Sequence, residues 1–189
     1  MAHVVSDMSM SLDGFVTGPN DSRENPFGDG ADTLHNWFLE NPTEADLAFL
    51  TDAVAGTGSV VMGRKSFDKC VEMWGPNGPL AGAPVFVVTH NAPTKEHPPC
   101  YRFVTDGVES ALKQAEDVAG DRAVGLHGAT VMQQALPLGL VDEIIVHVVP
   151  VLIGGGTRLF ETFDSAVTLE RTDAIVTPGA THLRFRVVH

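Results

Sequence analysis

The alternation of short β-like runs with helical segments constrains the fold of this chain more than any other feature. The β-like runs cover residues 4–10, 59–62, 85–88, 101–104, 123–126 and 141–149, and helical patterns cover 45–54, 66–72, 108–118 and 131–138. Two further β-like runs, 168–176 and 181–188, follow at the end around a Pro-Gly turn. This order predicts one domain over residues 1–189, an α/β fold with three layers. Its central sheet is mixed and mostly parallel, is flanked by helices and is closed by a C-terminal antiparallel hairpin.

Two connecting segments add detail to this prediction. Thr43 is a plausible N-cap for the helix over 45–54, because acidic residues occupy the first turn after it. Residues 17–30 are rich in Gly, Asn, Asp and Pro, so they form a loop. A loop of this length is uncommon unless it has a function, and long loops are often binding lids.

The composition excludes several classes of function. The chain has 12 Lys and Arg against 24 Asp and Glu, with a formal net charge of −12. Nucleic acids and anionic membrane surfaces both require clustered cations, so we expect neither as a partner. The eight histidines form no metal-binding spacing such as H-E-x-x-H, so we expect no metal site.

The location of the protein is also suggested by the sequence. Its beginning lacks the basic and apolar regions of a signal peptide, and no apolar run approaches the length of a membrane span. Cys70 and Cys100 are isolated, so we expect free thiols in a reducing compartment. We therefore expect a cytoplasmic protein.

One turn contains two of the three lysine and arginine residues that lie between Glu24 and Thr94. The β-like run ending at Met62 is followed by Gly63, Arg64, Lys65 and Ser66, and then by a helical segment. Glycine allows close approach of a ligand to the backbone, and the start of a helix presents free N–H groups and a positive dipole. The pattern suits a phosphate, although a strand that ends in a solvated turn would have the same composition.

A second turn has the same position relative to its strand. Gly125-Leu126-His127 leads into Gly128, Ala129 and Thr130, directly before a helical pattern. In open α/β sheets ligands lie at the carboxyl ends of the strands, so the two turns could hold the two ends of a diphosphate. Alternatively, Gly128 and Ala129 only allow close packing of helix on sheet. The third glycine-rich segment, 154–156, is not followed by a strong helix start, which favours a turn or bulge.

Two carboxylates are candidates for acid chemistry. Asp13 lies at a predicted strand end before a glycine, and Asp46 lies in the first turn of a predicted helix. Each also has a structural alternative, since Asp-Gly is a common turn and a helix dipole favours an acidic first turn.

Taken in this order, the turns resemble the dihydrofolate reductase superfold. The closer resemblance is to the reductase domain of the bifunctional riboflavin-biosynthesis deaminase-reductase. It rests on S-M-S-L-D-G-F-V at 9–16, V-V-M-G-R-K-S-F at 60–67, the turn at 125–130, and G-L-V-D-E-I at 139–144 with P-V-L-I-G-G-G at 150–156. Neither H-x-E nor P-C-x-x-C, the zinc-ligand motifs of the deaminase half of that enzyme, occurs in this sequence, so we expect no deaminase activity.

The resemblance implies that NADPH is the cofactor and that the chain is a reductase. The matched cofactor positions are Met10 and Asp13 with Ser9 beside the nicotinamide, Gly63, Arg64, Lys65 and Ser66 at the phosphates, Thr89, His90 and Asn91 at the adenosine 2′-phosphate, and Gly128, Ala129 and Thr130 under the diphosphate. Family members usually have two adjacent glycines at the last turn, where this chain has His127-Gly128. The His127 side chain is therefore expected to point away from the cofactor.

The resemblance also suggests a substrate side. Asp46 matches a substrate-binding carboxylate of dihydrofolate reductases, and Thr157 a threonine bonded to that carboxylate. We therefore take Asp46, Asp13 and Thr157 as candidate catalytic residues. A functional Asp46 favours a pteridine, whereas an idle one favours a ribitylated or other substrate.

Three functions stay open at this stage. The first is an NADPH-dependent reductase of a small heterocyclic or sugar-derived substrate, such as 5-amino-6-(5-phosphoribosylamino)uracil. The second is dihydrofolate reduction, and the third a nucleotide-binding module with little or no turnover. We expect the loop at 17–30, with Trp37 and Trp74, to cover the substrate. By family analogy, an edge strand at 141–149 and the last hairpin would build a homodimer.

Overall fold

The computed structural model describes residues 2–80, 82–161 and 163–189. The first half contains β1 (Val4–Ser11), β2 (Phe15–Thr17), η1 (Asp32–His35), α1 (Asn36–Leu39), α2 (Glu44–Gly56), β3 (Thr57–Gly63), α3 (Arg64–Trp74), η2 (Gly75–Asn77) and β4 (Val85–Val88). The second half contains β5 (Tyr101–Val104), α4 (Val108–Ala119), β6 (Ala123–His127), α5 (Ala129–Ala135), η3 (Leu136–Leu138), β7 (Glu143–Val149), β8 (Thr157–Arg158), β9 (Thr168–Val176) and β10 (Thr181–Val188).

Eight strands form one central sheet in the order β5-β4-β3-β6-β1-β7-β10-β9. All pairings from β5 to β7 are parallel, and only β7–β10 and β10–β9 are antiparallel. Strands β2 and β8 form a separate antiparallel pair. The predicted mixed, mostly parallel sheet with a C-terminal hairpin is confirmed.

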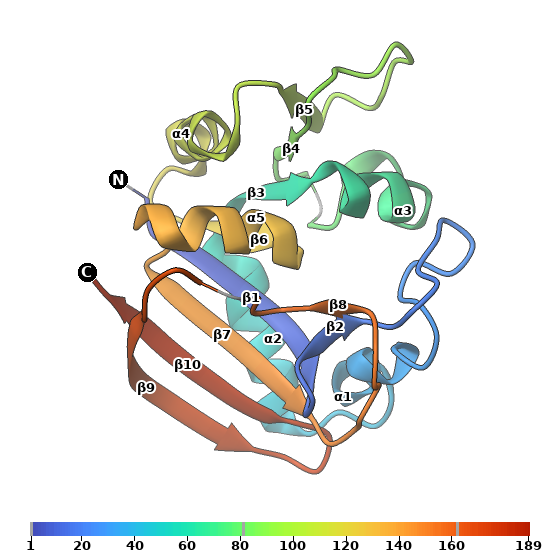
Figure 1. Ribbon diagram of the computed structural model, residues 1–189, viewed down its shortest axis with the longest axis vertical. Coiled ribbons are helices and arrows are strands. Elements are labelled where there is room, and N and C mark those ends of the chain that lie inside the picture. Colours follow the sequence, from blue (N-terminus) through green and yellow to red (C-terminus); the bar gives the residue numbers. More distant parts are fainter. Residues whose placement is uncertain (1, 81, 162) are drawn as a thin grey trace.

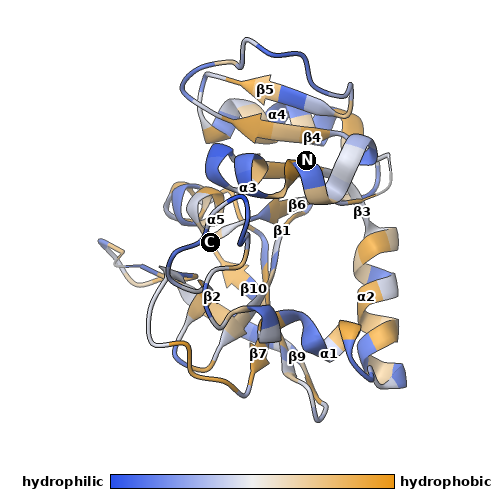
Figure 2. Cartoon of the chain, turned by 90° about the vertical axis from the view of Figure 1, so that its right-hand side faces the viewer, coloured by the Kyte–Doolittle hydropathy of each residue, from blue (hydrophilic) through white to orange (hydrophobic). Residues whose placement is uncertain are grey.

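Helices cover both faces of the sheet, because alternate strand residues point to opposite sides. Val61 of β3 belongs to the core beneath α4 and α5, whereas Val60 and Met62 belong to the core beneath α3. Figure 1 shows α5 in front of the sheet and α2 behind it. In Figure 2, after a quarter turn, α2 and α5 lie on opposite sides of the strands. These are the three predicted layers.

Strand β7 corrects one expectation about the edge of the sheet. It pairs with β1 on one side, from Val5–Glu143 to Ser11–Val149, and with β10 on the other. The segment 141–149 is therefore interior rather than an edge, because β10 folds back beside it. Within the described chain, the free edge at that end belongs to β9. The homodimer stays a prediction, and at this end of the sheet it would have to pair through β9.

Helix α2 begins at the predicted N-cap, but its apolar residues are not all buried. Thr43 caps it through a reciprocal capping box with Asp46. However, Asp46 is buried, while Leu47 and Val54 are each 47% exposed. The apolar pattern of this segment therefore does not mark one buried face.

No helix in the described part of the chain has the length and apolar character required to span a membrane.

Candidate functional site

Three cavities meet around the carboxyl ends of the parallel strands. The strand-end cavity, of about 480 Å³, lies beyond β3, β4, β5 and β6. Its lining comprises Gly63, Arg64, Lys65, Ser66, Val88, Thr89, His90, Asn91, Thr105, Gly107, His127, Gly128, Thr130, Val131 and Gln134. The structure thus brings together three of the four segments that the sequence predicted to contact a dinucleotide. This is where open α/β sheets bind ligands.

Arg64 joins two of these segments. It is the first residue of α3, its Nε donates to the Asp68 carboxylate at 2.8 Å, and its Nη1 donates to the Asn91 carbonyl at 3.3 Å. The Thr89 hydroxyl also donates to that carbonyl, at 3.0 Å. The guanidinium is therefore held at the mouth of the cavity beside the free N–H groups of a helix start.

The two lysines of α3 share one acidic partner that the sequence analysis did not identify. Asp21 accepts from Lys65 at 3.0 Å and also from Lys69, which ties the loop of residues 18–31 to α3. Burial alone would raise the pKa of Asp21, but the hydrogen bonds from Lys69 and Lys65 lower it. The role of Asp21 could not be predicted, because nothing in the sequence of a loop indicates which helix the loop crosses.

Gly128 is required by the geometry of the second turn. Its φ is +93°, and a Cβ at this position would lie 2.6 Å from the Ser66 Oγ. The turn after β6 therefore packs directly against the start of α3. Thr130 lines the strand-end cavity, and Ala129, which is buried, lines the neighbouring loop cavity.

The loop cavity, of about 360 Å³, lies under the loop of residues 18–31. It is bordered by Pro26 and Phe27 of the loop, Lys69 and Trp74 of α3, and Thr157 of β8. The helix-side cavity, of about 300 Å³, lies between α2 and the sheet. Trp37 borders the helix-side cavity, so the two tryptophans flank different cavities rather than covering a single one.

His127 is the residue that all three cavities share. Its ring meets the Trp74 ring edge to face at 4.9 Å, and its Nδ1 is buried without a hydrogen-bond partner in the described chain. Burial, with smaller contributions from His35 and Lys69, lowers the pKa of His127 to about 4. A neutral imidazole therefore separates the cavities, in place of the first of the two family glycines.

We expect His127 to stay neutral down to about pH 4, because its site disfavours the charged form. The measurement is a pH titration of histidine ring nitrogens by NMR, with His127→Gln to assign the signal. Since the folded pKa lies below that of the unfolded chain, the residue should contribute stability that is lost as the pH falls from about 6.5 towards 4. A ring that becomes protonated near pH 6.5 in the folded protein would contradict this assignment.

The helix-side cavity has a polar end on an otherwise apolar wall. Asp7, Met8 and Ser9 of β1 and His147 of β7 border it, with Trp37, Phe38, Phe49 and Leu50 among the apolar residues. The Trp37 indole N–H donates to the Ser9 hydroxyl at 2.9 Å. Ser9 was predicted beside the nicotinamide, and alternation along β1 could have identified Asp7 on the same face.

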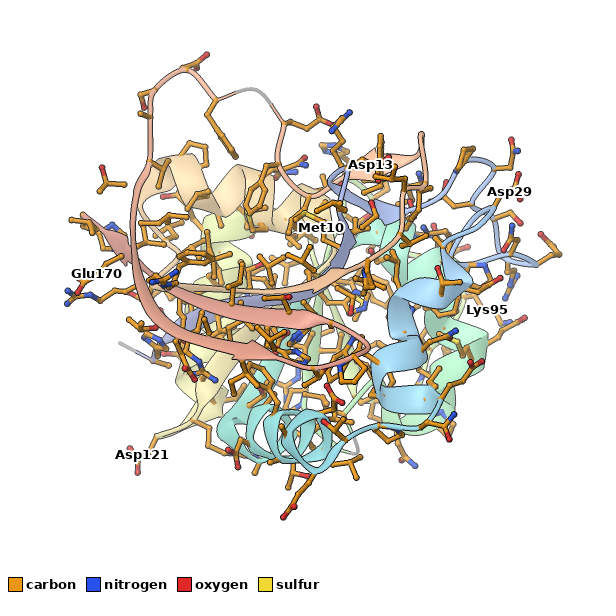
Figure 3. The ribbon with its side chains drawn as sticks, turned by 90° about the horizontal axis from the view of Figure 1, so that it is seen from below. Met10, Asp13, Asp29, Lys95, Asp121 and Glu170 are labelled. Atoms are coloured by element: carbon orange, nitrogen blue, oxygen red, sulfur yellow. The ribbon has the colours of Figure 1, made fainter. Side chains whose placement is uncertain are left out.

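Met10 and Asp13, also predicted beside the nicotinamide, lie elsewhere. Figure 3 labels both, near the end of β1. Met10 packs against the main core cluster, and neither residue borders any of the three cavities. The Asp13 carboxylate accepts hydrogen bonds from the Ser11 hydroxyl at 2.6 Å and from the backbone N–H of Ile153 and Gly154. These bonds lower the pKa of Asp13 to about 2, the one from Ser11 most. The glycine-rich segment is therefore a turn held by Asp13.

The expected pairing of Asp46 with Thr157 is wrong. Asp46 accepts hydrogen bonds from the Thr43 hydroxyl at 2.6 Å, from the Thr177 hydroxyl at 2.9 Å and from the His182 ring at 2.8 Å. The Thr157 N–H instead donates to the Thr17 hydroxyl at 3.4 Å, in the β2–β8 pair. With a side chain that is only 2% exposed, the Asp46 carboxylate is closed off from solvent.

Two histidines were missed by the sequence analysis as site residues. Neither His147 nor His182 was given a role by the sequence. They face each other across the β7–β10 pair, and their Nδ1 atoms are 2.7 Å apart. His147 also contacts the Asp7 carboxylate at 2.7 Å. Alternation places each residue on a face, but only the register brings the two rings together.

Comparison with known proteins gives a family match over nearly the whole chain. The profile of the family described as the RibD C-terminal domain matches residues 2–182. A curated relative, the uncharacterized protein YyaP of Bacillus subtilis strain 168, is 25% identical over 183 residues, which cover 88% of this chain and 85% of YyaP.

Solved structures agree in fold. A putative riboflavin biosynthesis protein from Shewanella sp. PV-4 superposes with a TM-score of 0.76 at 23% identity, covering 100% of both chains. Dihydrofolate reductase from Enterococcus faecalis, complexed with NADP(H) and RAB-propyl, superposes with a TM-score of 0.64 at 15% identity, covering 99% of this chain and 97% of that one. The predicted dihydrofolate reductase-like fold is confirmed.

Proposed function

The chain belongs to the RibD C-terminal domain family, and we propose that it is an NADPH-dependent reductase that reduces a C=N or C=O bond of a small substrate. The observation that carries this proposal is the strand-end cavity. Turns from β3, β4 and β6 line it, and it meets the apolar helix-side cavity at His127. A dinucleotide and a second small molecule could therefore lie side by side.

The residues of the strand-end cavity fit the phosphates of NADPH. Arg64 and Lys65 supply charge, the start of α3 supplies N–H groups, and Gly128 leaves space where a Cβ would strike Ser66. Thr89, His90 and Asn91 offer polar groups for the adenosine 2′-phosphate. When bound, NADPH supplies the hydride. The protein would hold the reactants in place and exclude water with the loop that Asp21 fastens to α3.

The character of the helix-side cavity favours an uncharged ring as the substrate. Among its described lining residues there is no lysine or arginine, and the only carboxyl group is that of Asp7. A substrate phosphate would have to reach Lys65 and Lys69 in the loop cavity, and both of these side chains already form ion pairs with Asp21. We therefore propose a small heterocyclic or sugar-derived carbonyl or imine without a phosphate. A pteridine was favoured only by a carboxylate at Asp46 that could bind substrate, and the Asp46 carboxylate is buried away from the cavity surface.

We expect Arg64→Ala to weaken NADPH binding by about 10- to 100-fold, because one good charged contact contributes roughly 1.5–3 kcal/mol. The measurement is quenching of tryptophan fluorescence during titration with NADPH and, separately, with NADH. Wild-type protein should prefer NADPH, because only NADPH carries the 2′-phosphate. The variant should lose most of that preference, because the Arg64 guanidinium lies against Asn91, at the end of the cavity proposed for the 2′-phosphate. Arg171→Ala is the matched control, since Arg171 lies on β9, far along the sheet from this cavity.

Equal affinity for NADPH and NADH in the wild type, or an Arg64→Ala variant with unchanged affinity, would contradict the phosphate site. Turnover is then tested by NADPH oxidation with 7,8-dihydrofolate, with 5-amino-6-(5-phosphoribosylamino)uracil and with its dephosphorylated form. The proposal expects the dephosphorylated uracil to be the better substrate of the last two. Tight NADPH binding without oxidation by any of the three would favour the nucleotide-binding module.

A further inference from the structure

Four titratable side chains form a continuous hydrogen-bonded chain beneath the helix-side cavity. Asp7 Oδ1 and His147 Nε2 are 2.7 Å apart, His147 Nδ1 and His182 Nδ1 are 2.7 Å apart, and His182 Nε2 and Asp46 Oδ1 are 2.8 Å apart. The residues come from β1, β7, β10 and α2 respectively. We call this set the Asp7–Asp46 relay.

Aromatic rings pack against the relay, and most of it is screened from solvent. The Trp37 ring lies 4.4 Å from the His147 ring, and the Phe49 ring stacks on His182 at 5.2 Å. The side chains of His182, Asp46 and His147 are 0%, 2% and 4% exposed, whereas that of Asp7 is 29% exposed. Asp7 and His147 border the cavity, so protons can pass between relay and cavity at this end.

Each of the three contacts in the relay needs one proton to form a hydrogen bond. The bonds from Thr43 and Thr177 hold Asp46 as a carboxylate, so His182 donates its Nε2 proton to it. Two Nδ1 atoms at 2.7 Å require one proton between them. The contact between His147 and Asp7 holds a third proton. It resides on Asp7 if both rings are neutral, or on the ring if His147 is imidazolium.

Removal of that third proton leaves one contact in the relay with two facing lone pairs. The fully hydrogen-bonded relay therefore carries one transferable proton, which leaves through Asp7. The titratable groups around His147 are Asp7 on β1, His35 on η1, Asp46 on α2 and His182 on β10. Burial lowers the pKa values of both His35 and His182, which keeps excess charge away from those rings.

We propose that Asp7, backed by His147, is the proton donor for the substrate reduced in the helix-side cavity. This rests on the proposed reductase function. The substrate carbon receives the hydride with its electron pair, the π bond of C=N or C=O breaks, and the heteroatom takes the proton from Asp7. The relay is then one proton poorer and regains it from solvent through Asp7 after product release. His147 and His182 are positioning residues that store and share the proton.

The first test needs neither cofactor nor substrate. In protein labelled with ¹⁵N-histidine, NMR should show the rings of His147 and His182 titrating together with one common midpoint. Asp7→Asn should shift that midpoint at both rings, whereas His3→Gln should leave it unchanged, because His3 lies on the surface against Asp142 and Glu143. If the two rings have independent midpoints that Asp7→Asn does not change, the inference that they share a proton is wrong.

The second test is kinetic and uses whichever of the three probes named above supports NADPH oxidation. Asp7→Asn should lower kcat about 100-fold, as expected for loss of a general acid, while NADPH affinity stays within about twofold. Asp7→Glu should restore part of the rate, and His182→Gln should move the pH midpoint of kcat. A folded Asp7→Asn variant with an unchanged kcat would overturn the donor role.

The two tests separate this inference from the function on which it rests. If NADPH does not bind to wild-type protein, the proposed function fails, and the donor role fails with it. In that case the NMR titration still decides whether the four residues share a proton. If NADPH binds and turnover proceeds without Asp7, only the donor role is lost.

Discussion

Replacing Asp46 by alanine should destabilise the fold by about 3–5 kcal/mol, because breaking a buried pair leaves polar partners without a counterpart. The carboxylate of Asp46 satisfies the Thr43 N–H and hydroxyl, the Thr177 hydroxyl and the His182 ring. It therefore joins the start of α2 to the last hairpin. The free energy of unfolding from urea denaturation measures the effect.

Asp52→Ala is the matched control. Asp52 lies on the same helix and is exposed, so its replacement should change stability by no more than about 0.5 kcal/mol. Similar stability losses in both variants would contradict the role given to Asp46.

The same carboxylate should make stability depend on acid pH. Burial alone would raise the pKa of Asp46, but the hydrogen bonds from Thr43, His182 and Thr177 lower it to about 2 from its ordinary value of 3.8. The stabilisation is therefore present above about pH 4 and is lost as the pH falls towards 2. It amounts to about 2 kcal/mol. The Asp46→Ala variant should lack this part of the acid dependence.

The second large effect is expected at Gly156. A Cβ there would lie 2.0 Å from the Thr17 carbonyl oxygen, and φ is +114°, a conformation that residues other than glycine rarely adopt. Since backbone cannot move aside as a flexible side chain can, Gly156→Ala should cost at least about 3 kcal/mol and should separate β8 from β2. Urea denaturation and the backbone NMR shifts of Phe15–Thr17 measure these two consequences.

Gly154 provides the comparison that isolates the steric clash. It also has a positive φ, +80°, but no described atom beyond its chain neighbours lies within 4 Å of the point that an added Cβ would occupy. Gly154→Ala should therefore cost only the backbone strain, about 1 kcal/mol. Equal costs at both positions would show that strain alone, and not the contact with Thr17, restricts Gly156.

The turns that line the strand-end cavity were predictable because their residues follow their strands directly. Gly63 to Ser66, Thr89 to Asn91 and Gly128 each come at the end of a short apolar run. Parallel strands of one sheet have their carboxyl ends at one edge, so identifying the strands was enough to bring these turns together. The helix start at Thr43 was predictable for the same reason, since a capping box lies within four residues.

The contacts beside the helix-side cavity were not predictable in this way. His147 reaches Asp7 across 140 positions of sequence, and His182 reaches Asp46 across 136. A shift of one residue in the register of β7 or β10 would turn a histidine to the other face of the sheet. Thr157 was named from the family resemblance, and no local pattern in the sequence tells which distant threonine approaches the start of α2.

The alternating α/β plan, the central sheet with its closing hairpin, and the turns that border the strand-end cavity were predictable from the amino-acid sequence alone. All of these follow from periodicity and from residues adjacent in the chain. Three further features emerged only in the folded chain: β7 is interior, Asp21 fastens the loop to α3, and Asp7, His147, His182 and Asp46 meet. Those contacts depend on strand order and register, which are set by the packing of the whole core.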